Sequence, residues 1–274
     1  MSNLVTTDWL EAHLKDVRVV DASWYMPDEK REPAREFEAG HIPGAVFFDI
    51  DGIADRSTGL PHMLPSPGEF SRAVGALGIG DGETVVAYDG SGLFSAPRVW
   101  WTFKAMGHDK VKVLDGGFPK WKREGRAVES GPAHPTNKFF TAIARPEIVR
   151  DFAGVKDIVG ARSAQIVDAR SAARFKAEEP EPRAGVRGGH MPGAVNVHYR
   201  KLIAEDGTMK APEALRAAFD AVDLGRPIIT TCGSGLTAAM LSLALDEIGA
   251  KDVALYDGSW TEWGGRPEAP VVTG

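Results

Sequence analysis

The sequence predicts an α/β protein made of two tandem copies of one domain, each a parallel sheet flanked by helices. The chain has 274 residues, which exceeds the usual size of a single domain. A set of short motifs occurs twice in the same order, which indicates an internal duplication. Short and nearly continuous hydrophobic runs alternate with helical patterns, as is typical of a parallel sheet covered on both faces.

The duplication is visible in four landmarks that recur in one order. They are a His-x-Pro-Gly-Ala-Val turn, a Gly-Ser-Gly-Leu loop, an Asp-Gly pair and a tryptophan. Repetition of all four in order indicates a tandem repeat rather than chance. They fall at residues 41–46, 90–93, 115–116 and 121, and again at 190–195, 233–236, 257–258 and 263.

The expected domain boundaries follow from this repeat and from a breaker-rich connection at residues 129–135. We expect an N-terminal non-catalytic domain at residues 1–135, a linker at 136–145 and a C-terminal catalytic domain at 146–274. The strands expected from the hydrophobic runs lie at residues 17–21, 84–88, 111–115, 165–168, 227–231 and 252–256.

Composition and charge narrow the function classes. A net charge of -6 argues against nucleic acid as a main partner, because that role usually needs a basic face. No apolar run has the length of a bilayer span, and the N-terminus has no apolar signal core. A single cysteine cannot form an internal disulfide, which fits a reducing compartment. We expect a cytoplasmic enzyme with no membrane partner.

That one cysteine, Cys232, lies where a β-branched run ends and an Ala- and Leu-rich helical stretch begins. A thiol at a helix N-terminus lies near the positive end of the helix dipole, which favours the thiolate. Gly233 and Gly235 allow the backbone N–H groups to turn toward one point, as in an anion-binding nest. The pattern predicts a nucleophile. Its counterpart in the first copy is Asp89, which can accept N–H bonds but cannot carry sulfur.

Other interpretations of this loop fit the sequence less well. A lone cysteine is often an inert packing residue, but packing does not require a glycine cradle. A cysteine phosphatase loop needs an arginine where this chain has Ala238. Neither Ser91 nor Ser234 has the glycine of a hydrolase elbow two residues before it, and the glycines complete no P-loop or dinucleotide fingerprint. No His/Cys cluster has zinc-ligand spacing, so no metal is expected.

The repeated turn, the cysteine loop and the paired Asp-Gly and Trp endings resemble those of the two-domain rhodanese-fold sulfurtransferases over essentially the whole chain. Residues 232–237 read Cys-Gly-Ser-Gly-Leu-Thr. This loop resembles the Cys-Gly-Ser-Gly-Val-Thr loop of 3-mercaptopyruvate sulfurtransferases, with Leu236 as a modest apolar departure. Thiosulfate-preferring members typically carry Arg and Lys directly after the cysteine. The uncharged loop agrees with this distinction, because a dianion such as thiosulfate gains from cations beside the thiolate.

Positive groups must therefore come from elsewhere in the chain. The resemblance places substrate-binding arginines at Arg174 and Arg183. A planar guanidinium suits the carboxylate and keto oxygens of mercaptopyruvate better than an ammonium group does. The other expected substrate-binding residues belong to the loop and are Gly233, Gly235, Leu236 and Thr237.

The resemblance also implies a proton relay of serine, histidine and aspartate, which corresponds here to Ser234, His62 and Asp51. Each has a structural alternative. Ser234 could cap the following helix, and His62, between prolines at 61 and 65, could be an ordinary loop residue. His41 and His190 recur in both copies of the turn and are expected to be structural.

The function implied is a 3-mercaptopyruvate sulfurtransferase that moves sulfur from a small-molecule donor through a Cys232 persulfide to cyanide or a thiol, such as thioredoxin or a small thiol. No organic cofactor is implied. A thiosulfate sulfurtransferase with the same persulfide step is the alternative within the family. A non-catalytic persulfide carrier module is the alternative from another class. A monomer is favoured.

Overall fold

The computed structural model describes residues 2–274, which form two compact units. The first contains the described residues through Asp55, together with Leu64–Arg145 and Ala204–Met209. The second contains Arg56–Met63, Pro146–Ile203 and Lys210–Gly274. Two short segments thus pack with the unit formed by the other half of the sequence. Residues 136–145, the expected linker, belong to the first unit.

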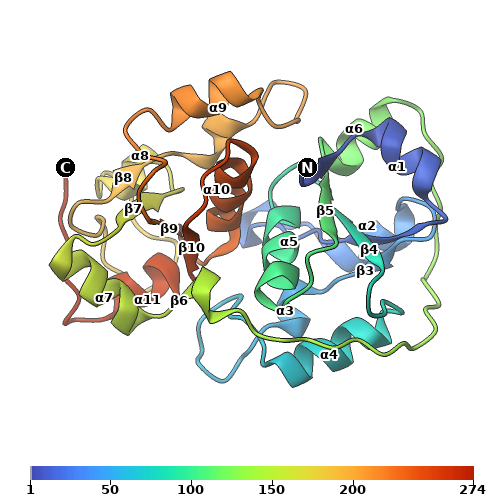
Figure 1. Cartoon of the computed structure of the whole chain (residues 1–274), viewed down its shortest axis with the longest axis horizontal. Helices are drawn as coiled ribbons and strands as arrows, with labels where there is room; N and C mark the ends of the chain where they lie inside the picture. Colours follow the sequence, from blue (N-terminus) through green and yellow to red (C-terminus); the bar gives the residue numbers. More distant parts are fainter. Residues whose placement is uncertain (1) are drawn as a thin grey trace. The chain divides into compact units, whose positions relative to one another are not determined.

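Each unit contains a five-stranded sheet with the same strand order (Figure 1). All strand pairs are parallel, so the predicted duplicated α/β fold is confirmed. In sheet order, the first consists of β1 (Leu4–Val5), β5 (Val111–Leu114), β4 (Thr84–Tyr88), β2 (Val17–Asp21) and β3 (Val46–Phe47). The second consists of β6 (Val149–Arg150), β10 (Val253–Tyr256), β9 (Ile228–Thr231), β7 (Gln165–Asp168) and β8 (Val195–Asn196).

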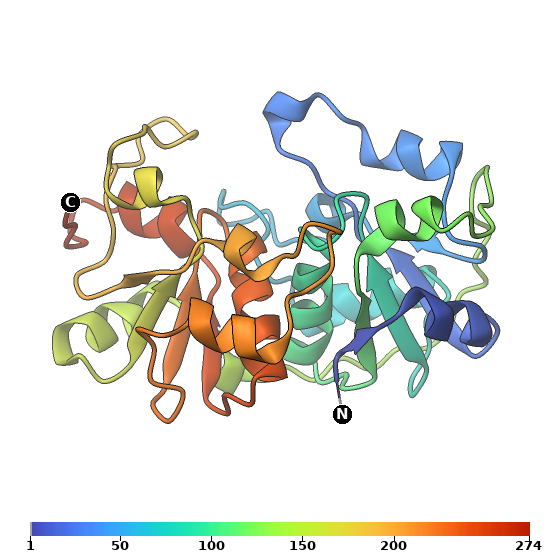
Figure 2. The same cartoon turned by 90° about the horizontal axis from the view of Figure 1, so that it is seen from above.

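Helices lie on both sides of the strands in each unit (Figure 2). Their starts follow local capping rules. In one example Ser66 accepts from the N–H of Glu69 and the Glu69 carboxylate accepts from the N–H of Ser66, with Pro67 at the first helical position. The α-helices of the first unit are α1 (Thr7–His13), α2 (Pro33–Ala39), α3 (Ile50–Ile53), α4 (Pro67–Ala76), α5 (Ala96–Ala105) and α6 (Gly117–Arg123).

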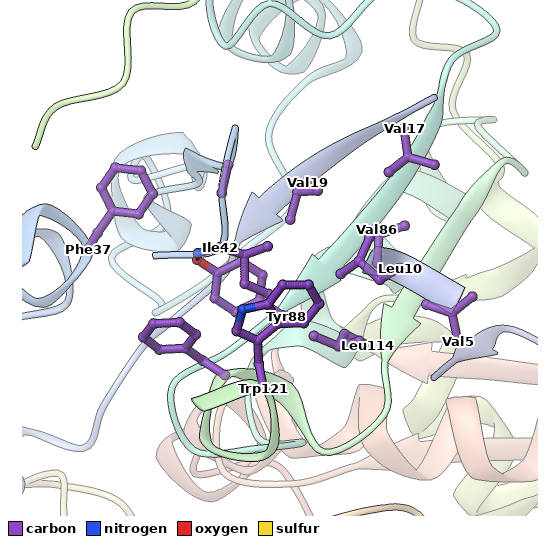
Figure 3. Packing of buried hydrophobic residues seen from close by; sticks show 12 residues of the cluster. Val5, Leu10, Val17, Val19, Phe37, Ile42, Val86, Tyr88, Leu114 and Trp121 are labelled. Atoms are coloured by element: carbon purple, nitrogen blue, oxygen red, sulfur yellow. The ribbon is translucent and has the colours of Figure 1, made fainter. Parts of the chain in front are cut away.

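The core on one face of the first sheet follows from the alternation of side chains along its strands. Val19, Val86 and Tyr88 point to the face where Leu10 of α1 and Trp121 of α6 are buried (Figure 3). On the opposite side, a cluster of phenylalanine rings joins α4 and α5 to residues 136–145. Phe140 is buried there, with its ring edge-on to those of Phe70 and Phe103. These contacts explain why the expected linker packs on the first unit.

The second unit has α7 (Phe152–Ala161), α8 (Ala172–Phe175), α9 (Pro212–Ala218), α10 (Leu236–Glu247) and α11 (Ser259–Gly265). One core cluster joins Ile166, Ile229 and Tyr256 of the sheet to Trp260 and Trp263 of α11. Most residues of α10 are buried, which matches a helix that is apolar around most of its circumference. Within residues 2–274, no helix is long and apolar enough to cross a membrane.

The two histidines of the repeated turn have the same structural role. The ring of His41 stacks on Phe37 at 4.0 Å between centroids, and that of His190 stacks on Phe175 at 3.7 Å. In each case Nδ1 lies within hydrogen-bond distance of the phenylalanine carbonyl oxygen. Both histidines are buried. They fix the turn in each unit and lie outside the candidate site.

Candidate active site

Cys232 follows β9 directly and lies at the carboxyl end of the second sheet, only 2% exposed. Ligands of open parallel sheets bind at this edge. The Cys232 N–H donates to the hydroxyl of Ser259 at 3.2 Å, and its carbonyl accepts from the N–H of Trp260 at 2.9 Å. The start of α11 therefore fixes the backbone of the cysteine from both sides.

The loop after Cys232 is shaped by its glycines. Gly235 has φ 78°, a left-handed conformation that glycine adopts without strain. A Cβ on Gly233 would lie 3.1 Å from Nη2 of Arg174, so this position admits the guanidinium only because no side chain is present. Leu236 and Thr237 open α10, whose first turn has no side-chain cap among the described residues. The positive end of the α10 dipole thus lies at the cysteine loop.

Both predicted substrate-binding arginines converge on Gly233. Arg174 comes from α8 and places its guanidinium over Gly233. Nη1 of Arg183 donates to the hydroxyl of Thr261 at 3.4 Å, and that hydroxyl donates to the carbonyl of Gly233 at 2.6 Å. The Thr261 N–H donates to the same carbonyl at 2.9 Å. The structure therefore brings together two cationic side chains and the residue next to Cys232.

A buried ion network holds Arg174 in this place. Nε of Arg174 donates to Glu181 Oε1 at 3.3 Å and its Nη2 donates to Oε2. Nη1 of Arg170 donates to the same Oε1 at 2.7 Å, while its other nitrogens bond the carboxylate of Asp168 at 2.7–3.1 Å. Arg170 is also stacked on Trp260, with its Cζ 4.2 Å from the ring. The Arg170, Glu181 and Asp168 side chains are at most 4% exposed.

Sequence reasoning missed Arg170, Glu181, Thr261 and Ser259. Ser259 could have been found from the sequence. It follows the Asp-Gly pair of the second copy, at the position where the first copy has Gly117. Both have left-handed backbones, with φ 49° at Ser259 and φ 54° at Gly117. A serine that keeps a glycine conformation is strained, and here its hydroxyl bonds the cysteine backbone. The other three had no such signal, because their role depends on side-chain contacts that no short sequence motif marks.

The Ser234 and His62 pair expected for the relay is present. His62 belongs to segment 56–63 of the second unit, and its Nδ1 lies 3.0 Å from Ser234 Oγ. Both side chains are buried. His62 has φ 61°, a conformation that costs a non-glycine residue about 1–3 kcal/mol. The surrounding structure therefore holds this histidine against a local backbone preference.

The third expected relay residue, Asp51, belongs to α3 of the first unit. Its Oδ2 accepts a hydrogen bond from Nε1 of Trp24 at 2.8 Å. This contact orients the carboxylate within that unit. The contact between Ser234 and His62 thus lies within the second unit, while the bond between Asp51 and Trp24 lies within the first.

The first copy of the loop has an anion of its own. Asp89 Oδ2 accepts from the N–H groups of Phe94, Ser95 and Ala96 at 2.8–2.9 Å, and Oδ1 accepts from that of Ser91 at 2.8 Å. The carboxylate is 1% exposed. It satisfies the N–H groups that converge in this cradle, as expected of a side chain that can accept N–H bonds.

Fold and site together define a two-domain α/β protein with a cysteine at a strand-to-helix loop and two arginines at the residue after it. The chain belongs to the family of rhodanese-like domain proteins, whose model matches residues 6–124 and 152–266. It is 42% identical to human 3-mercaptopyruvate sulfurtransferase, over 99% of this chain and 95% of that protein. It is 43% identical to bovine thiosulfate sulfurtransferase, with the same coverage. The crystal structure of SseA from Escherichia coli matches it with a TM-score of 0.87 and 42% identity, over 95% of this chain and 99% of that chain.

Proposed function

We propose that the chain is a sulfurtransferase that takes sulfur from 3-mercaptopyruvate through a persulfide on Cys232. The observation that carries this proposal is the convergence of Arg174 and Arg183 on Gly233, next to the only cysteine. Two guanidinium groups beside a thiol match a donor that has a carboxylate and a keto oxygen near its sulfur. The similarity to human 3-mercaptopyruvate sulfurtransferase supports the same assignment.

In the first half-reaction the Cys232 thiolate attacks the sulfur of the donor. A bond forms between the two sulfur atoms, the carbon–sulfur bond breaks, and its electron pair remains on the carbon as the enolate of pyruvate. The N–H groups at the start of α10 stabilise negative charge at the loop, as in an oxyanion hole. The enolate then takes a proton and leaves as pyruvate, so that the enzyme keeps a persulfide.

The Ser234 and His62 pair provides a route for that proton. Ser234 is two residues after the cysteine, and its hydroxyl oxygen lies 3.0 Å from His62 Nδ1. A hydroxyl that is hydrogen-bonded to an imidazole can pass a proton to a nearby anion. Asp51, whose Oδ2 accepts a hydrogen bond from Trp24, is proposed as the third member of the relay on the family resemblance.

In the second half-reaction a thiolate acceptor or cyanide attacks the outer sulfur of the persulfide. The bond between the two sulfur atoms breaks and its electron pair returns to Cys232 as thiolate. Thioredoxin or a small thiol is the acceptor proposed. These steps need only the cysteine and the two substrates, so the proposal includes no organic cofactor.

Thiosulfate is the second candidate donor, because bovine thiosulfate sulfurtransferase is as similar to this chain as the human relative is. Overall identity therefore does not distinguish the two donors. The loop favours 3-mercaptopyruvate, since residues 233–237 carry no charge and the dianion thiosulfate would gain from cationic side chains within the loop itself, in addition to Arg174 and Arg183. We therefore assign 3-mercaptopyruvate as the preferred donor.

Mass spectrometry and donor kinetics test this function. Incubation with 3-mercaptopyruvate should add one sulfur atom to the wild-type chain and none to Cys232→Ser. The kcat/KM for 3-mercaptopyruvate should exceed that for thiosulfate by at least about tenfold, which corresponds to one missing charge-assisted contact. An unmodified wild-type chain would refute the persulfide step, and a preference for thiosulfate would select the alternative donor. Absence of repeated turnover with small thiols would indicate a carrier module instead.

A further inference from the structure

A pocket of about 300 Å³ lies at the carboxyl end of the first sheet, away from Cys232 in sequence and outside the proposed reaction. It is lined by the last residue of β2, Asp21, by Gly90 after β4 and by Phe118 of α6. Its size is at the lower end of the range of small-molecule sites. Because the chain is duplicated, the equivalent residues of the second unit indicate which chemical group this pocket can bind.

Asp21 and Asp168 are equivalent residues of the two units. Each ends the strand at the same place in its sheet. The Oδ1 of each accepts the N–H of the residue two positions later at 2.9 Å, which is Ser23 in the first unit and Arg170 in the second. Ser23 therefore occupies the position of Arg170.

The ring on the other side of the pocket is equivalent in the same way. The N–H of Phe118 donates to the carbonyl of Asp89 at 3.0 Å, just as the N–H of Trp260 donates to that of Cys232 at 2.9 Å. Gly40 and Gly189 also correspond, because each directly precedes the histidine of the repeated turn. Asp21, Gly40 and Phe118 all line the pocket.

In the second unit the equivalent walls hold a guanidinium. That of Arg170 is bonded to the carboxylate of Asp168 at 2.7–3.1 Å, donates to the carbonyl of Gly189 at 2.8 Å, and lies over the ring of Trp260 at 4.2 Å. In the first unit Ser23 ends in a hydroxyl, which accepts from the N–H of Gly90 at 2.8 Å. The short side chain leaves the pocket between a carboxyl group, a glycine and an aromatic face.

The charges around the pocket favour a cation beside Asp21. Asp21 is 3% exposed, and no Lys or Arg among residues 2–274 lies within ion-pair distance of it. Burial raises the pKa of this carboxyl, hydrogen bonds with Ser23 and Tyr88 oppose the rise, and the charge of Asp89 adds to it. A buried carboxylate without a cationic partner is costly, and a guanidinium that pairs with it removes that cost.

The basic side chains of the pocket have other contacts. Arg31 pairs with Glu36 at 2.5 Å and lies over the ring of Tyr25 at 3.6 Å. Nζ of Lys122 lies over the ring of Phe118 at 4.7 Å, which shows that this ring accepts a cation, but Lys122 is not paired with Asp21. Arg31 directs its guanidinium to Glu36 and Tyr25, and Lys122 carries a compact ammonium, so neither takes the place beside Asp21 that Arg170 takes beside Asp168 in the second unit.

The geometry points to a binding site in the first unit for a small molecule that carries a guanidinium group on a short aliphatic chain. The guanidinium pairs with the carboxylate of Asp21 and stacks against Phe118, as Arg170 does with Asp168 and Trp260. A planar fork of donors suits this pocket better than a compact ammonium does. This site is separate from sulfur transfer and does not depend on the proposed function.

Titration of the full chain with methylguanidinium chloride, followed by saturation-transfer NMR of the ligand methyl group, tests the site. Methylammonium chloride at equal ionic strength is the matched control ligand. We expect saturable binding with a Kd on the order of 1 mM, as suits a fragment of this size. Asp21→Asn should weaken binding at least about tenfold through loss of the charged pair, and methylammonium should bind at least about tenfold more weakly.

Two variants at Ser23 distinguish loss of binding because the pocket is filled from loss of binding because the pocket is disrupted. Ser23→Arg should abolish binding, because the new side chain fills the pocket as Arg170 does. Ser23→Ala removes the hydroxyl without filling the pocket and should retain binding. Persulfide formation at Cys232 in each variant reports that the chain is folded. Non-saturable binding to the wild-type chain would overturn the inference, and so would equal binding to Ser23→Arg or to Asp21→Asn.

Discussion

Glu181 accepts hydrogen bonds from both Nε and Nη2 of Arg174, and this carboxylate fixes the guanidinium that lies over Gly233. Glu181 also receives Nη1 of the fully buried Arg170. The carboxylate does not itself carry out the chemistry. We expect it to act as a positioning residue, because it holds Arg174, which the proposed function places on the donor.

Glu181→Gln should therefore raise KM for 3-mercaptopyruvate by about three- to tenfold while kcat changes less, because a neutral amide weakens the charge-assisted bonds to Arg174. Steady-state kinetics with separate kcat and KM values check this. Glu178→Gln is the matched control, since the Glu178 side chain is 63% exposed. A Glu181→Gln variant that loses kcat in proportion to a loss of folded protein would contradict a positioning role.

Ser234 and His62 should behave as one unit in a double-mutant cycle. We expect Ser234→Ala or His62→Ala to lower kcat by about 10²-fold, and the double variant to lose little more, because residues of one relay have non-additive effects. Measurements of kcat for the four proteins give the coupling. His134→Ala is the control for loss of a histidine, because His134 belongs to the exposed connection. Full turnover in His62→Ala would dismiss the relay.

Asp89 should be a stability residue rather than a catalytic one. Asp89→Ala leaves four N–H groups of a buried loop without their acceptor, and we expect a loss of about 2–4 kcal/mol in the free energy of unfolding of the first unit. Urea unfolding followed by tryptophan fluorescence measures it, with Ser91→Ala as a control in the same loop. Persulfide formation below the transition should persist. Unchanged stability would show that the cradle does not depend on its carboxylate.

The segment at residues 136–145 should loosen in acid. Burial alone would raise the pKa of Glu83, but hydrogen bonds from Arg18 and Lys138 outweigh it and hold the pKa at about 2, below the ordinary 4.5. This lowered pKa stabilises the fold fully above pH 4.5, and the contribution is lost as the pH falls toward 2. With allowance for partial exposure we expect about 1–2 kcal/mol. Glu83→Gln should flatten the fall of unfolding free energy between pH 4.5 and 2, and an unchanged slope would contradict the assignment.

Local sequence signals were sufficient for the main elements of the fold. The runs that became β2, β4, β5, β7, β9 and β10 were readable because buried parallel strands are continuously apolar. The four strands β1, β3, β6 and β8 have two residues each, and no periodicity can be read from so short a segment. The course of segments 56–63 and 204–209 was likewise unreadable, because only long-range packing decides which unit a loop joins.

The sequence by itself determined the duplication, the α/β class, the placement of Cys232 at a strand-to-helix loop and the presence of Asp89 at the matching position of the first copy. These features reside in residues close together in the chain or in motifs that repeat. Only the tertiary structure decided that Arg174, held by Glu181, and Thr261 meet at Gly233. It also decided that Ser23 of the first unit occupies the position equivalent to Arg170 of the second. The contacts of Gly233 with Arg174 and Thr261 join separate segments of the chain, and their energy depends on burial and geometry that no local pattern records.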